Sequence, residues 1–176
     1  MILIMICLAN LFRSILLVSI LVTMASPLVA GELSLLINGK AIHLGDAKSD
    51  NLNENNWGAG LQYDYEIINN KWVPFSTVSA FKDSNRESSF YVGGGIMRRY
   101  MLGSDAESSL HFDAGLVGFL MTRKDYRDRE PFLGILPAFS VGNKNVAVNI
   151  TYIPKVDPKL VPLWFFQLKV STSIFD

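Results

Sequence analysis

The feature that most constrains the fold of this chain is an alternation of apolar and polar residues that recurs along it. In "WGAGLQYDYEII", which starts at Trp57, apolar and aromatic residues alternate with glycine and polar residues. A period of two residues is that of a β-strand with one apolar face. The pattern recurs in "SLHFDAGLVGFL", with His111 and Asp113 on the minority face, and in "LWFFQLKVS", with Gln167 and Lys169 there. These segments therefore predict strands with one apolar and one mixed face.

Eight such segments follow one another, and no helical period lies between them. They are residues 33–43, 57–68, 71–82, 89–101, 108–121, 132–141, 145–153 and 162–174. Strands of about ten residues that are apolar outside and mixed inside are typical of small outer-membrane barrels. A soluble barrel of the lipocalin type also alternates, but its inner face is apolar. Because charged residues lie on the minority face, we predict an all-β fold, an eight-stranded antiparallel transmembrane β-barrel.

The first 30 residues predict an export signal. They contain one charge, Arg13, followed by the apolar run "SILLVSILV" and the small-residue region "MASPLVA". This order is typical of a secretory signal peptide, with cleavage expected between residues 25 and 30. An uncleaved membrane anchor is the alternative, because the apolar segment is nearly long enough to span a bilayer. The single cysteine, Cys7, lies in this segment, so the predicted barrel domain, residues 31–176, contains no thiol.

Charge and histidine content exclude other classes of function. The formal net charge is zero, and no nucleic-acid or phosphate-loop motif is present, so we expect no nucleic-acid partner. Two isolated histidines do not make a metal site, and we expect no metal or other cofactor.

Connection lengths predict which residues share one rim of the barrel. The short connections are residues 69–70, 102–107 and 142–144. The connections that are longer on average and strongly charged are residues 44–56, 83–88, 122–130 and 155–161. Barrels of this kind have short turns on the periplasmic side and longer loops outside. Strand parity then brings the following residues to the outer rim: His43, Asp83, Ser84, Arg123 and Pro154.

A histidine and a serine at one rim are groups that acyl transfer requires. Serine is a poor nucleophile until a base accepts its proton, and histidine is well suited to do so near neutral pH. The residues also have simpler interpretations. Asp83, Ser84 and Asn85 together are ordinary turn residues, whose side chains bond neighbouring backbone groups. His43 is then a solvated residue at the end of a strand.

Three consecutive glycines, residues 93–95, stand inside a predicted strand, where glycine is costly. One interpretation is that they permit curvature of the barrel wall. The other is that Gly93 and Gly95, which share a face, leave a slot in the barrel interior that receives an apolar chain.

From about Asn53 to Lys169 the chain resembles the outer-membrane lipid A palmitoyltransferases, the PagP family. The resemblance is carried by "NENNWGAG", "AFKDS", the glycine pair in "VGGGI", "LPAFSVG" and "TYIP", which occur in the family's order. It implies an enzyme that takes a palmitoyl chain from the sn-1 position of a phospholipid and attaches it to a hydroxyl of lipid A. It also implies that the catalytic residues are His43, Asp83 and Ser84.

The resemblance assigns substrate-binding residues as well. Gly95 corresponds to the strand glycine that sets the floor of the family's acyl pocket, which makes the slot the better interpretation for Gly93 and Gly95. Pro137 and Pro154 match the pair that flanks a lateral lipid gateway, because proline cannot donate to the strand ladder. We place Arg123, at the same rim, with the substrate-binding residues. The implied setting is a monomer in the outer membrane of a Gram-negative bacterium.

Two features depart from the family. Asn56 stands where a second gateway has a proline, and Gly31 leads almost directly into "LSLLINGK", so that the N-terminal amphipathic helix is predicted to be short or absent. They leave two alternatives open: a non-catalytic lipid-binding barrel, and a lipid A deacylase on a similar barrel.

Overall fold

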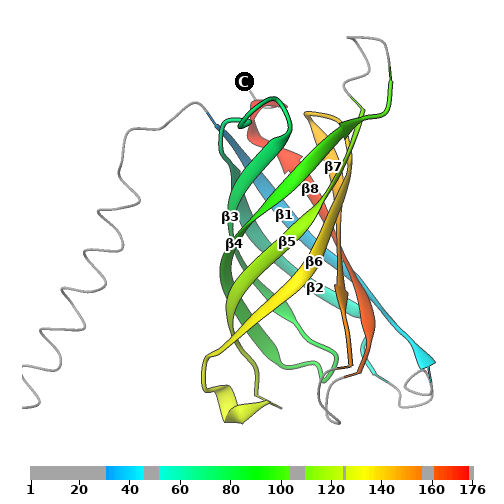
Figure 1. Cartoon of the computed structure of the whole chain (residues 1–176). Coiled ribbons are helices and arrows are strands. Elements are labelled where there is room, and N and C mark those ends of the chain that lie inside the picture. The colour runs from blue at the N-terminus through cyan, green and yellow to red at the C-terminus, as the bar shows by residue number, and fades with distance from the viewer. Residues whose placement is uncertain (1–30, 46–51, 104–109, 125, 156–160, 175–176) are drawn as a thin grey trace, which may run out of the picture. The chain divides into compact units, whose positions relative to one another are not determined.

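The chain folds into a closed barrel of eight antiparallel strands, in which each strand pairs with its neighbours in sequence and the last pairs with the first (Figure 1). This computed structural model describes residues 31–45, 52–103, 110–124, 126–155 and 161–174. The strands are β1 (Glu32–His43), β2 (Asn55–Asp64), β3 (Trp72–Lys82), β4 (Ser88–Met101), β5 (His111–Thr122), β6 (Phe132–Gly142), β7 (Val146–Ile153) and β8 (Leu163–Ser171). The predicted fold class is therefore confirmed, whereas the predicted signal segment lies outside the described residues.

The alternation of the sequence corresponds to the inside and outside of the barrel. On β8, Gln167 and Lys169 are buried in the interior while Leu168 between them is 39% exposed. On β5, Asp113 is buried and Leu116 is 55% exposed on the outer surface. An apolar outer surface around a polar interior suits a barrel that spans a membrane.

The second predicted strand is too long at its C-terminal end. β2 ends at Asp64 because the next position across the ladder is Pro74, which accepts a hydrogen bond from the Tyr65 amide at 2.9 Å but has no N–H to return one. The predicted turn is present but contains three residues, 69–71, because Ile68 pairs with Trp72. Asn69 and Asn70 adopt φ values of 52° and 56°, a left-handed conformation that asparagine tolerates and that tight hairpins require.

Short 3₁₀ turns are the helical elements of the described residues. They include η2 (Arg127–Arg129), in the connection between β5 and β6, and η3 (Thr172–Ile174), after β8. Within the part of the chain that is described, no helix has the length and apolar character needed to cross a membrane.

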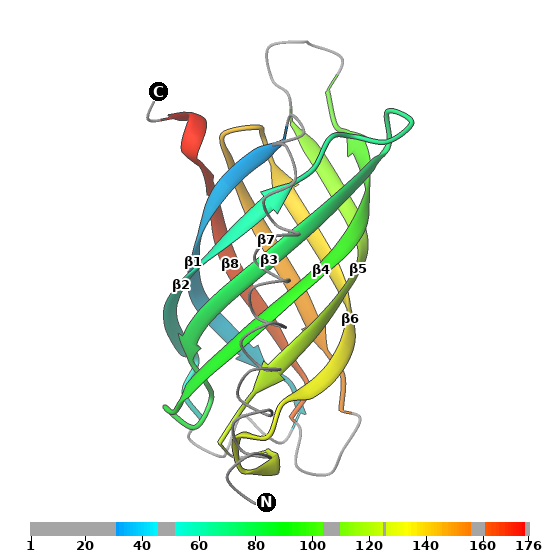
Figure 2. The ribbon, with the colours of Figure 1, turned by 90° about the vertical axis from the view of Figure 1, so that its left-hand side faces the viewer.

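The two ends of the barrel differ as strand parity predicts (Figure 2). At the loop end, the lower end in Figure 1, β1, β3, β5 and β7 finish and the charged loops begin. At the turn end, the chain passes from β2 to β3, from β4 to β5 and from β6 to β7. His43, Ser84, Arg123 and Pro154 therefore all lie at the loop end, each at or just after the last residues of a strand.

Candidate active site

His43 faces the interior of the barrel because β1 contains a bulge. Asn38 is buried, so strict alternation places residues 40 and 42 inside and His43 outside. The pairing of β1 with both neighbouring strands shifts just after Asn38, and the parity reverses: Lys40 is 55% exposed whereas His43 is 1% exposed. A β-bulge adds one residue and re-aims the side chains beyond it. The interpretation of His43 as a solvated strand-end residue is wrong.

The interior position of His43 brings its ring to Ser84. Nε2 of His43 lies 2.9 Å from Oγ of Ser84, which belongs to the loop between β3 and β4. The loop between β1 and β2 holds this serine in place, because the Asn53 amide donates to the Ser84 carbonyl oxygen at 2.8 Å. A histidine nitrogen within hydrogen-bond distance of a serine hydroxyl is the arrangement of a base and the group that it activates.

Asp83, the third predicted catalytic residue, is buried and bonded within its own loop. Its carboxylate accepts hydrogen bonds from the backbone amides of Asn85 and Glu87, at 2.9 and 3.0 Å, and from the hydroxyl of Ser89 at 2.8 Å. These are the turn contacts expected of an aspartate at this position. Asp83 thus fixes the backbone that carries Ser84, and its hydrogen bonds hold the turn rather than the imidazole of His43.

Arg123 lies next to Asp83 at the rim. It follows β5 directly, its side chain is 14% exposed, and its Nε is 4.0 Å from Oδ2 of Asp83. The structure therefore brings Arg123 to the same rim as His43 and Ser84, where it supplies a positive charge.

Glu54, which the sequence patterns did not single out, lies beside the other ring nitrogen of His43. Its Oε1 is 3.8 Å from Nδ1 of His43, and its Oε2 is 3.3 Å from Nζ of Lys40. The hydrogen bond with Lys40 lowers the pKa of the Glu54 carboxyl. The sequence feature that could have identified Glu54 as a site residue is its position inside "NENNWGAG", because that motif also contributes residues around the site.

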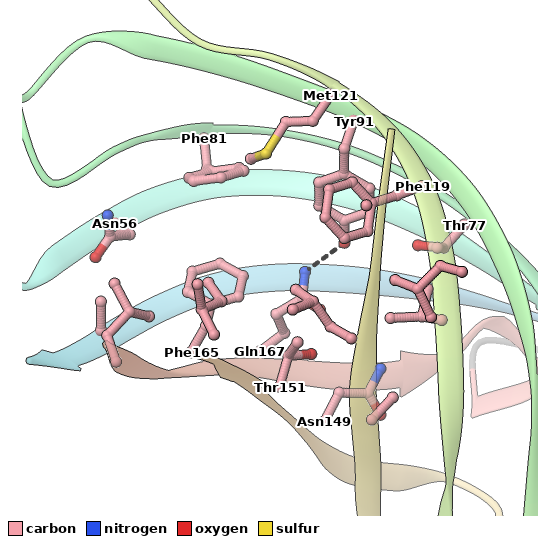
Figure 3. A pocket seen from close by; sticks show the side chains of 18 of the residues that line it. Asn56, Thr77, Phe81, Tyr91, Phe119, Met121, Asn149, Thr151, Phe165 and Gln167 are labelled. Atoms are coloured by element: carbon pink, nitrogen blue, oxygen red, sulfur yellow. Dashed lines mark hydrogen bonds between the residues drawn. The ribbon is translucent and has the colours of Figure 1, made fainter. Parts of the chain in front are cut away.

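A cavity of about 310 Å³ opens inward from this rim (Figure 3). Asp83, Ser84 and Arg123 line its outer end, while most of its wall is apolar or aromatic. Figure 3 shows side chains from several strands directed into the same space, among them Phe81, Phe119 and Phe165. Buried Phe75, Met97, Val117 and Ala138 form one hydrophobic cluster that also lines the cavity. The space fits a hydrocarbon chain better than a polar ligand.

The predicted slot beside the glycines is occupied by a side chain of the protein. A Cβ atom added to Gly95 comes within 2.8 Å of Cζ of Phe75, and within 2.1 Å of the carbonyl oxygen of Leu116. At Gly93 an added Cβ comes within 2.4 Å of the carbonyl oxygen of Gly118. The glycines therefore permit close approach of the β4 and β5 backbones. Phe75, directly opposite Gly95 in the ladder, lines the cavity beside them.

The two predicted gateway prolines flank an interruption of the ladder. Pairing between β6 and β7 begins at Ala138 and Thr151, so residues 132–137 of β6 pair with β5 alone. Pro137 is the last residue before this ladder, and Pro154 follows the end of β7 and lines the cavity. In Figure 1 these two strands diverge toward the loop end. The cavity thus has a neighbouring wall without a complete hydrogen-bond ladder.

Asn56 occupies the corresponding place between β2 and β3. It is 2% exposed, and its Nδ2 donates to the Lys82 carbonyl oxygen at 2.7 Å, beyond the last ladder pair of Gly58 and Phe81. A proline has no such donor, so Asn56 ties together two strand ends that a proline leaves apart. Within the described ranges, no group of three histidine, cysteine, aspartate or glutamate residues is placed to hold a metal ion.

Comparison with known proteins places this chain in a family. The model of the family described as "Antimicrobial peptide resistance and lipid A acylation protein PagP" matches residues 34–166. The chain belongs to the PagP family. "Lipid A acyltransferase PagP" of Bordetella pertussis is 31% identical over 117 residues, 66% of this chain and 61% of that protein. A protein of the same name from Methylobacillus flagellatus is 30% identical over 107 residues, 61% of this chain and 55% of that protein.

The chain thus aligns with less than two thirds of the length of these PagP relatives. Among solved structures, the backbone structure of the outer membrane protein Ail of Yersinia pestis has a TM-score of 0.43 and 13% identity, covering 80% of this chain and 99% of Ail. A TM-score this low supports no conclusion about function.

Proposed function

We propose that this PagP family member is an outer-membrane acyltransferase, which moves a palmitoyl chain from the sn-1 position of a glycerophospholipid to a hydroxyl of lipid A. The observation that carries the proposal is the contact of His43 Nε2 with Ser84 Oγ at the mouth of an apolar cavity. The names of the relatives support the substrate class. The protein then acts as a monomer in the outer membrane of a Gram-negative bacterium.

The chemistry is an exchange of esters in two steps. Nε2 of His43 accepts the proton of the Ser84 hydroxyl while Oγ attacks the carbonyl carbon of the donor ester. The bond between that carbon and the glycerol oxygen breaks, and the glycerol oxygen takes the proton from His43 and leaves as the hydroxyl of a lysophospholipid. A lipid A hydroxyl then attacks the acyl-serine and gives its proton, through His43, to Oγ. The new ester replaces the old one, and the reaction needs no redox cofactor.

The remaining predicted residues have places in this scheme. The acyl chain lies in the cavity, with Phe75 beside Gly95 in its wall. Arg123, at the rim, binds the phosphate of the donor headgroup. The interruption between β6 and β7, flanked by Pro137 and Pro154, gives the lipid a lateral route to the cavity.

Mass spectra of lipid A from cells with and without the full-length protein test this function. We expect an added species heavier by one palmitoyl group, which disappears when His43→Gln replaces the wild type. A loss of one acyl group indicates the deacylase instead. An unchanged spectrum from cells that contain folded barrel indicates the non-catalytic lipid-binding alternative. Either of these two results contradicts the proposal.

A further inference from the structure

The two nitrogens of the His43 ring have different surroundings, and only one of them has a hydrogen-bond partner in the described part of the chain. Nε2 faces the Ser84 hydroxyl at 2.9 Å. Nδ1 is buried and has no hydrogen-bond partner within the described part of the chain. A neutral imidazole carries one proton, so Nε2 accepts from Ser84 only when that proton is on Nδ1. A group that favours a proton on Nδ1 therefore favours the reactive tautomer.

Asp83 is not placed to be that group. Its carboxylate receives three hydrogen bonds from its own loop, from the amides of Asn85 and Glu87 and from the Ser89 hydroxyl. Turning Asp83 toward the imidazole breaks bonds that shape the loop carrying Ser84. An acid that orients His43 must come from elsewhere at the rim.

Glu54 is the carboxylate that faces Nδ1, at 3.8 Å. Its backbone is fixed against β1, because the Ala41 amide donates to the Glu54 carbonyl oxygen at 2.8 Å. The backbone amide of His43 also lies close enough to the carboxylate to contribute to its lowered pKa, after the larger effect of Lys40. Glu54 is thus held beside His43 as an anion, with a side chain that is 37% exposed.

We propose that Glu54 is the positioning residue of this site: it accepts a hydrogen bond from Nδ1–H of His43 and so holds the imidazole with Nε2 ready for the Ser84 proton. The proposed hydrogen bond requires the Glu54 side chain to rotate so that the 3.8 Å separation of Oε1 and Nδ1 shortens. Lys40 holds the carboxylate at the rim from the solvent side. The role of this contact in catalysis rests on the proposed acyl transfer. The hydrogen bond between Glu54 and His43 can exist whether or not the protein transfers an acyl chain.

The tautomer of His43 is the readout that tests the contact directly. The chain contains two histidines, so nitrogen NMR of ¹⁵N-histidine-labelled full-length protein in micelles gives few signals, and His43→Gln identifies those of His43. At a pH where the ring is neutral, we expect the proton on Nδ1 in the wild type. In Glu54→Leu we expect a shift toward the tautomer with the proton on Nε2. Glu54→Gln keeps the size of the side chain and an acceptor oxygen, and is expected to fall between the two.

Glu87→Gln is the matched control. Glu87 is also 37% exposed at the loop end, and it pairs with Lys124 as Glu54 pairs with Lys40. Its pKa is likewise lowered, by the hydrogen bond with Lys124. Because its carboxylate bonds away from His43, Glu87→Gln is expected to leave the tautomer unchanged. If removing any negative charge at the rim were enough to change the tautomer, Glu54→Gln and Glu87→Gln would change it equally.

Steady-state kinetics supply the second readout. In Glu54→Leu we expect kcat to fall by about 10²-fold with KM nearly unchanged, less than the roughly 10⁴-fold loss seen when a buried acid that orients a catalytic histidine is neutralised. Folded Glu54→Leu with the wild-type tautomer and the wild-type kcat overturns the inference while leaving the proposed function intact. If the wild-type protein transfers no acyl chain, the proposed function fails, and a tautomer shift in Glu54→Leu still supports the contact.

Discussion

The two halves of the barrel interior differ in the kind of side chains that fill them. The turn-end half is filled with paired charges: Lys169 Nζ lies 2.7 Å from Oδ2 of Asp64, and Arg99 contacts both carboxylate oxygens of Asp113, at 3.0 and 2.8 Å. Gln62 adds a hydrogen bond of 2.6 Å to Asp64. The loop-end half instead contains a mostly apolar cavity, with Ser84 and Arg123 at its rim and buried polar side chains such as Gln62 and Gln167 deeper in its wall.

One short barrel thus contains a closed polar network at its turn end and a binding cavity at its loop end. Buried charges are tolerated only when they are paired and hydrogen-bonded, so the turn-end network is a closed unit with little room for a ligand. Apolar walls gain nothing from water, which leaves the cavity available to a hydrocarbon chain. We infer that chemistry belongs to the loop end and that the turn end serves as a scaffold.

Ser84→Ala gives the largest expected effect and removes only the loop-end chemistry. Without the hydroxyl that His43 is proposed to activate, we expect the rate of acyl transfer to fall by at least about 10³-fold, with the stability of the barrel unchanged. Acyl transfer to lipid A in mixed micelles measures it. Ser88→Ala, in the same hairpin and outside the contact with His43, is the control. Equal rates for wild type and Ser84→Ala contradict the role of Ser84.

Lys169→Met breaks the turn-end network and leaves the rim untouched. The change leaves the charge of Asp64 buried beside an apolar side chain, and we expect the free energy of unfolding to fall by about 3–5 kcal/mol. Urea unfolding in micelles, followed by tryptophan fluorescence, measures this loss. The double variant Asp64→Leu/Lys169→Leu removes both charges and is expected to regain most of the stability. A full loss of acyl transfer in the folded double variant contradicts the inference that the turn-end half is a scaffold and takes no part in the chemistry.

Phe75 and Gly95 give a smaller effect, on the choice of acyl chain. Phe75→Ala enlarges the cavity, and we expect longer chains to be accepted, with each additional buried methylene worth about 0.8 kcal/mol, or about fourfold in preference. Gly95→Ala is expected to shift the preference toward shorter chains by displacing the Phe75 ring, and to destabilise the barrel because its Cβ meets the Leu116 carbonyl oxygen at 2.1 Å. Competition between phospholipids of different chain length measures both. An unchanged preference in Phe75→Ala shows that another residue limits the chain length.

The alternation and the strand parity were sufficient to predict the barrel and the residues that share its loop-end rim. They predicted the strand order and brought His43, Ser84 and Arg123 to one end. Alternation alone did not give the direction of the His43 side chain, because the bulge after Asn38 reverses the parity of β1. A bulge depends on the pairing of both neighbouring strands, which a periodic pattern does not contain.

Two further details required the three-dimensional structure. Phe75 and Gly95 are direct ladder partners, so the phenyl ring fills the space that the missing side chain leaves, and a single-strand pattern does not reveal the partner. Glu54 precedes β2 and has no place in its period of two, yet the backbone bond to Ala41 carries it to His43. The periodic pattern of a single strand does not predict the contacts that loops and opposite strands make in the site.

The most direct test of the separation between the two halves is a lipid A mass spectrum from cells that produce one of three folded barrels. These are the wild type, His43→Gln, and the double variant Asp64→Leu/Lys169→Leu. We expect a palmitoylated species with the wild type and with the double variant, and none with His43→Gln. A palmitoylated species from folded His43→Gln, at the level of the wild type, contradicts the account.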